Sequence, residues 1–130
     1  MSGERTLLNR SNWRERLTDA LNDDPEFARS CELADESMTL VIGEERAWFK
    51  LYRGSIIDEE PYVPPFGSTF RLVGDRKAWE ELLRGETSLS EALYDGSIRS
   101  AGDTLEANRL REALELFVRQ MQRLSEVADG

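Results

Sequence analysis

The chain has 130 residues, a length typical of one domain, and its 39% hydrophobic content is sufficient for a single buried core. It contains 26 acidic and 17 basic side chains and no histidine, so its formal charge at pH 7 is -9. This negative balance argues against nucleic acid and against anionic membrane surfaces as partners, because both must be met by clustered Lys and Arg. We therefore expect one acidic domain over residues 1–130.

The sequence contains no segment that predicts export or a membrane span. Residues 1–10 include no apolar run of signal-peptide length, and no stretch approaches the roughly 20 apolar residues that cross a bilayer. Cys31 has no partner in the chain for a disulfide, which fits a reducing compartment. We expect a cytoplasmic protein without stable membrane insertion.

The first predicted elements are two helices. Ser11 or Asn12 can cap a helix over residues 13–21, where apolar side chains recur at helical spacing. A shorter helix starts at Pro25, a residue that suits a first helical turn, and buries Phe27. Its buried face also predicts that the cysteine is a small core residue rather than a reactive thiol.

Strands follow the two helices. Residues 38–42 and 47–51 alternate between apolar and polar side chains, which predicts a β-hairpin with one buried face. Residues 54–58 offer a third strand and residues 69–73 a fourth. The segment 58–67 between them is too rich in proline to pair as a central strand.

The helical period returns after the fourth strand. Asp75 is a candidate cap for one helix, and Ser88 begins another short one. A last short strand then lies around Ile98 and Ser100. Asp103 caps a long helix that continues to about Val127.

The residue types needed for catalysis are scarce. The absence of histidine removes the commonest general base and metal ligand and excludes a Ser-His-Asp or Cys-His arrangement. One cysteine without histidine also argues against a zinc site, and the scattered glycines form no phosphate-binding motif. Carboxylates lie in polar runs such as 58–60, which usually stay solvated. We predict no catalytic residue, no metal, no cofactor and no enzymatic activity.

The segment from residue 70 to residue 110 has a characteristic order of elements: a strand, a tryptophan-containing helix with a Leu-Leu-x-Gly stop, a second short helix, a Gly-x-Ile strand and a Gly-Asp start of the final helix. The residues that form this pattern are Phe70, Leu72, Gly74, Asp75, Trp79, Leu82, Leu83, Gly85, Leu89, Ala92, Gly96, Ile98, Gly102 and Asp103. The pattern resembles the sterol carrier protein 2 (SCP2-like) family.

This resemblance implies an α+β fold in which helices cover one face of a five-stranded, mostly antiparallel sheet. It also implies an apolar tunnel between the two layers that binds a sterol, fatty acid, fatty acyl-CoA or quinone-like ligand. The hydrophobic pattern leads independently to the same two layers.

The candidate ligand-binding residues are those that the inner face of the sheet and the facing helices would share. Such residues could instead touch one another and form an ordinary core, the usual outcome for small α+β domains. An empty apolar cavity of about 300 Å³ would cost on the order of 7 kcal/mol, so a large pocket must be filled or collapsible. The candidates are Phe49, Leu51, Phe70, Leu72, Trp79, Leu83, Leu93, Ile98, Phe117 and Met121.

The loop over residues 58–67 is more apolar than a plain surface connection. Tyr62 and Phe66 could form a lid over the mouth of a tunnel. The same aromatic side chains could equally pack against the edge of the sheet.

The last helix raises an alternative function. Its apolar residues Leu110, Leu114, Phe117, Met121 and Leu124 are spaced four, three, four and three, the seam of a short coiled coil. Packing on the protein's own sheet is favoured. If Phe117 is exposed instead, the helix and sheet face would serve a non-catalytic accessory or dimerisation module with a homodimer or partner interface.

Overall fold

A computed structural model describes residues 6–129, with side chains through residue 126, and helices and strands occupy most of this range. Residues 1–5, part of the segment in which we predicted no signal peptide, lie outside it. Among the described residues, no helix is both long and apolar enough to cross a membrane. The helices are η2 (Leu7–Asn9, a 3-10 turn), α1 (Trp13–Asn22), α2 (Pro25–Ser30), α3 (Arg76–Leu83), α4 (Leu89–Asp95), α5 (Thr104–Arg109) and α6 (Arg111–Asp129). The strands are β1 (Asp35–Ile42), β2 (Glu45–Tyr52), β3 (Ser55–Glu60), β4 (Phe70–Gly74) and β5 (Arg99–Gly102).

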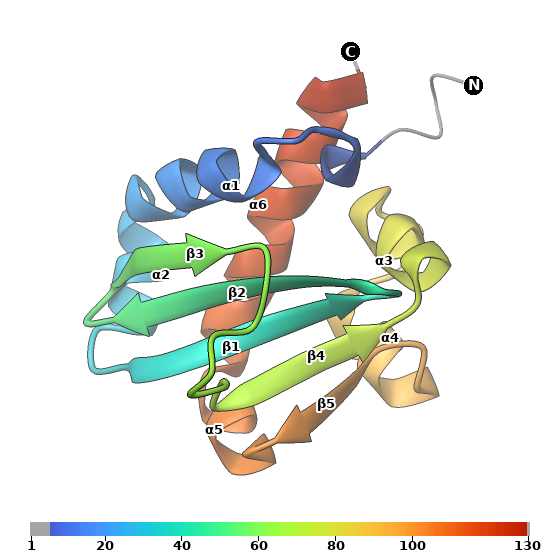
Figure 1. Ribbon diagram of the computed structural model, residues 1–130. Helices are drawn as coiled ribbons and strands as arrows, with labels where there is room; N and C mark the ends of the chain where they lie inside the picture. The colour runs from blue at the N-terminus through green and yellow to red at the C-terminus, as the bar shows by residue number, and fades with distance from the viewer. Residues whose placement is uncertain (1–5, 130) are drawn as a thin grey trace.

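The strands form one sheet in the order β3-β2-β1-β4-β5. Only the central β1–β4 pair is parallel, and the other three pairs are antiparallel. Figure 1 shows α6 passing behind the sheet, α1 above the β3 edge and the β3–β4 connection in front of the sheet. The predicted α+β fold, a mostly antiparallel five-stranded sheet with helices on one face, is therefore confirmed.

Alternation of side chains along each strand gives the sheet one apolar face toward the helices. Met38 lies opposite Phe49 on β2 and opposite Phe70 on β4, and Leu40 likewise lies between Ala47 and Leu72. All of these side chains are buried. A single period-two pattern thus continues across three strands, which explains why the sequence predicts this face well.

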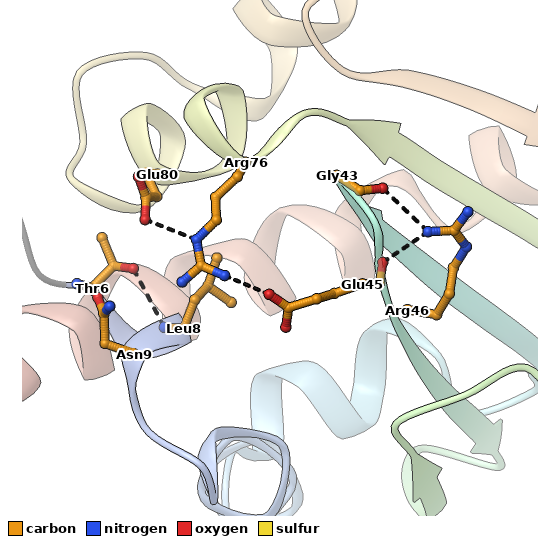
Figure 2. Close-up of polar contacts among 8 residues, drawn as sticks. All are labelled: Thr6, Leu8, Asn9, Gly43, Glu45, Arg46, Arg76 and Glu80. Atoms are coloured by element: carbon orange, nitrogen blue, oxygen red, sulfur yellow. Dashed lines mark hydrogen bonds and ion pairs between the residues drawn. The ribbon is translucent and has the colours of Figure 1, made fainter.

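The N-terminal turn η2 fastens the chain to the last helix. The Leu7 N–H donates a hydrogen bond to the Ser125 hydroxyl at 2.9 Å, and both residues are buried. Thr6 caps the turn in a reciprocal arrangement with Asn9 (Figure 2). Sequence reasoning did not predict this turn.

Three predicted boundaries were wrong. The long helix after Asp103 is broken at Leu110, because α5 contacts β4 and β5 while α6 packs under α1 and α3, and one straight helix cannot do both. The last strand begins at Arg99, one residue after Ile98. Strand β3 continues through the acidic run to Glu60, because an edge strand leaves carboxylates room to face solvent or a cation.

Candidate ligand-binding site

The ten predicted ligand-binding residues come together in the layer between the sheet and the helices. Nine of them are at most 2% exposed, and Leu93 is half-buried against the same cluster. All ten therefore belong to one continuous apolar core.

Three aromatic rings line up through this layer. The Trp13 ring on α1 lies 6.2 Å from the Phe49 ring on β2, and Phe49 meets the Phe117 ring on α6 edge-on at 5.1 Å. Edge-to-face pairs of this kind stabilise the packing beyond the area they bury. The rings connect helix α1 to the centre of the core.

A cleft of about 400 Å³ opens where this aromatic line reaches the surface. Its apolar floor consists of Trp13, Ile42 and Ala47, all buried. Its rim consists of Arg14, residues 44–46 at the start of β2 and the loop 61–63. The cleft thus lies at the junction of α1, the hairpin and the proline-rich loop. A larger groove of about 690 Å³ over α2 and α6 is lined mainly by charged and polar side chains.

Ion pairs hold the rim of the cleft. The Arg14 Nε donates to Glu59 on β3 at 2.8 Å, while its guanidinium lies 5.9 Å from the centroid of the Trp13 ring. The acidic run 58–60, predicted to stay solvated, therefore contributes one carboxylate to an ion pair. The reason is that β3 turns Glu59 toward α1.

The hairpin turn is tied to α3 by a second cation. Arg76 donates to Glu45 at 2.6 Å and to Glu80 at 3.1 Å (Figure 2). Arg46 instead donates to the backbone carbonyls of Gly43 and Glu45. The turn that forms one rim of the cleft is therefore fixed to a helix of the neighbouring layer.

The two predicted lid residues lie in different places. Tyr62 lines the cleft and is 54% exposed, and the nearby Glu60 carboxylate raises its pKa, so the phenol stays neutral at physiological pH. Phe66 instead packs edge-on against Trp48 at 5.6 Å, on the sheet face opposite the helices. Of the two, only Tyr62 lies at the cleft, where a lid would have to be. Phe66 packs against the sheet, as the alternative interpretation has it.

Sequence reasoning missed Trp13, Arg14, Ile42 and Ala47 as parts of a site. The pattern around each of these residues indicates only whether it belongs to the core or to the surface of its own helix or strand. The cleft forms where three elements distant in sequence meet. The local signal available was the hairpin turn, which places residues 44–46 at a sheet end.

Cys31 behaves as a core residue. It is 2% exposed, and burial raises the pKa of its thiol to about 11. A thiol with so high a pKa is protonated at neutral pH and is a poor nucleophile. The described residues also contain no group of three or more side chains that could hold a metal ion.

The apolar seam of the last helix is covered by the protein itself. Leu110, Leu114, Phe117 and Met121 are buried, and Leu124 is half-buried against the same core. The favoured interpretation, packing on the protein's own sheet, is the observed one. A homodimer through this seam stays a prediction.

No protein-family model and no curated protein sequence matches the chain. Solved structures do. Sterol carrier protein 2 superposes with a TM-score of 0.79 at 16% identity, covering 91% of this chain and 99% of that one. A conserved hypothetical protein from Thermus thermophilus, described as possibly a sterol carrier protein, gives 0.75 at 16% identity over 89% and 88% of the two chains. Palmitated SCP2L2 from Aedes aegypti gives 0.54 at 17% identity over 77% and 89%. The chain therefore has the fold of sterol carrier protein 2, as the pattern of residues 70–110 predicted.

Proposed function

We propose that this protein is a non-catalytic carrier that binds an apolar ligand between its sheet and its helices. The ligand would contact the predicted residues around Phe49, Phe117 and Met121 and would enter through the cleft beside Trp13. The observation that supports this proposal is that the aromatic rings of Trp13, Phe49 and Phe117 extend from the floor of an open cleft into the apolar layer.

The same layer is closely packed, so binding must separate elements that now touch. The hairpin end is the place for this to happen, because its rim is held by the ion pairs of Arg14 and Arg76 rather than by apolar packing. Exposed ion pairs contribute about 0–1 kcal/mol each, so the Arg76–Glu45 pair can be broken at low cost. The ligand then supplies the apolar surface that the separated rings lose.

The fold supports the choice of ligand class. The structurally similar Aedes aegypti protein is a palmitated one. We propose a fatty acid, fatty acyl-CoA, sterol or quinone-like molecule for this chain, bound in the cytoplasm. The alternative accessory role through α6 has less support, because the apolar stripe of that helix is buried in the protein's own core.

Native mass spectrometry of the purified protein tests the proposal directly, since a co-purified lipid adds its mass to the folded chain. A thermal-shift series with palmitate, palmitoyl-CoA, a sterol and a quinone gives the class. Ligand at about 100 times its dissociation constant adds roughly 2.7 kcal/mol, a readily measured rise in melting temperature. No added mass and no shift with any of the four would refute the carrier function.

Two single variants separate the cleft from the rest of the loop. Tyr62→Ser should change the affinity or the association rate for the ligand, because Tyr62 lines the cleft. Phe66→Ser is the matched control, because Phe66 lies on the opposite face of the sheet. Equal effects of both variants would count against entry through this cleft.

A further inference from the structure

The sheet face opposite the helices carries a group of cations. Alternation along β2, β4 and β5 directs Arg46, Arg71 and Arg99 to this face, and all three are exposed. The strand register makes them neighbours of two valines: Val41 pairs with Arg46 and with Val73, and Val73 pairs with Arg99. Figure 1 looks onto this face.

No carboxylate occupies the strand positions next to Arg71 and Arg99. Arg71 pairs with Thr39 and Ala101, and Arg99 pairs with Val73; the acidic end of the row is Glu60, which pairs with Trp48 at the β3 edge. Within the described residues, Arg71 and Arg99 form no ion pair, and Arg46 bonds only to carbonyls of its own turn.

The acidic side chains near this face are held apart from Arg71 and Arg99. Glu45 is engaged by Arg76. Asp58 and Glu60 lie on β3, which β2 and β1 separate from β4 and β5, although β3 is the direct neighbour of the strand that carries Arg46. Arg71 and Arg99 therefore have no ion-pair partner among the described residues, and Arg46 adds a third cation at the hairpin end of the face.

An anchored aromatic side chain stands beside the cations. The loop that crosses the face is fixed by a hydrogen bond from the Thr39 hydroxyl to Ser68 at 2.9 Å and by Thr69 N–H to the Ser37 carbonyl at 2.9 Å. Phe66 rests on Trp48 at its base and is nevertheless 77% exposed. A large apolar ring held outward by a rigid loop has a fixed place from which to enter an apolar phase.

We propose that this cationic sheet face, defined by Arg46, Arg71, Arg99 and Phe66, docks the protein onto an anionic lipid bilayer. Guanidinium groups bind lipid phosphates, and a phenyl ring inserts at the level of the head groups. The cations and the ring are spread over an exposed sheet face, which suits a bilayer surface better than a folded partner. The attachment is peripheral and needs no membrane-spanning element.

The overall charge of -9 predicted the opposite, because composition averages over all faces. At an ionic strength of about 0.1 M, charges more than roughly 10 Å away are largely screened. The interaction of a docked face with a bilayer is therefore governed by the cations on that face, and acids on the helix side contribute little. Docking would also bring loop residues 61–63, which line the cleft, close to the lipid surface.

Co-sedimentation with vesicles at low ionic strength tests the proposal. We expect binding to vesicles of equimolar phosphatidylcholine and phosphatidylglycerol, none to phosphatidylcholine alone, and release at high salt. Each cation near an anionic surface is worth about 1 kcal/mol, so Arg71→Gln with Arg99→Gln should weaken binding about 30-fold. Phe66→Ser should weaken it about tenfold, the value of partly burying a phenyl ring.

Matched variants control for charge and for exposed apolar surface elsewhere. Arg119→Gln removes an exposed cation from α6, and Leu105→Ser removes a side chain that is 76% exposed on α5. Both should bind vesicles like the parent protein. Arg71→Lys with Arg99→Lys, which keeps the charge, should retain most of the binding. A melting curve for each variant shows whether it is folded.

Three outcomes would each overturn the proposal. The parent protein could bind both vesicle types equally, it could bind neither, or the Arg71 and Arg99 variants could lose no more binding than the controls. Equally strong binding to soluble polyglutamate would assign the face to acidic proteins and overturn the lipid assignment. The carrier function is measured separately: the same Arg-to-Gln variant should keep the full melting-temperature rise with palmitate. If the melting temperature of the parent protein does not rise with palmitate, the carrier function is refuted, whereas the docking result is unaffected.

Discussion

Replacing the two phenylalanines at the centre of the core by leucine measures how much the Phe49–Phe117 contact contributes to stability. Phe49 is completely buried and Phe117 is 1% exposed, with their rings edge-on at 5.1 Å and 81°. Replacing either ring by leucine removes buried apolar atoms and leaves a small cavity, at a cost of about 1.5 kcal/mol. Edge-to-face pairs contribute about 0.5–1.5 kcal/mol beyond this. We therefore expect the double variant to lose about 1 kcal/mol less than the sum of the single variants.

Urea unfolding of the parent protein, Phe49→Leu, Phe117→Leu and the double variant supplies the four free energies of unfolding that this cycle needs. Each single variant loses both the buried atoms and the ring pair, about 2.5 kcal/mol in all, and should also lower the melting temperature by about 9 °C. Additive losses would show that the rings are not coupled as the structure has them. A parent protein of twice the expected mass in light scattering, falling to the monomer mass in Phe117→Leu, would show instead that this ring lies in a dimer interface.

Three further measurements probe other parts of the fold. Gly54→Ala should lower the free energy of unfolding in urea by at least about 2 kcal/mol, because Gly54 has a φ of 87° and an added Cβ would lie 2.8 Å from the Ala28 carbonyl oxygen. An unchanged unfolding midpoint would contradict this backbone geometry. Iodoacetamide at about pH 8 should alkylate folded Cys31 far more slowly than the urea-unfolded chain, because the thiol is buried with a pKa of about 11, and equal rates would show an exposed thiol. Burial and the neighbouring Glu106 carboxylate raise the pKa of Glu36, so the unfolded chain ionises this group more readily and stability falls as pH rises through the raised pKa. Glu36→Gln should therefore be more stable than the parent at neutral pH and equal to it at about pH 4, and a deficit at neutral pH would reverse the assigned sign.

The elements that could be predicted from the sequence are those with a local periodic signal. The alternation in the β-hairpin predicted its inner face, and the helix caps Asp75 and Ser88 predicted two helix starts that the structure confirms through hydrogen bonds to Ala78 and Glu91. The buried positions of the candidate ligand-binding residues follow from the same patterns. Propensity and burial suffice here because each residue's environment is set within its own element.

The features that could not be predicted depend on how separate elements meet. The apolar stripe from Leu110 to Leu124 is continuous in sequence, and nothing local marks the break at Leu110 that tertiary contacts impose. The cleft combines α1, a hairpin turn and a loop, so no sequence window contains it. The apolar character of the loop suggests a common place for Tyr62 and Phe66, but the first lines the cleft and the second packs on Trp48 on the outer face of the sheet.

The acidic end of β3 has a consequence for how copies of the protein behave toward one another. Strand β3 is an outer strand of the sheet, and an unpaired strand edge is a template for intermolecular strand addition. Asp58, Glu59 and Glu60 form its last three residues. Another copy that paired there through its own β3 would bring the two acidic runs together, and their mutual repulsion would oppose aggregation. Replacing Asp58 by Asn and Glu60 by Gln should therefore make the protein more prone to self-association.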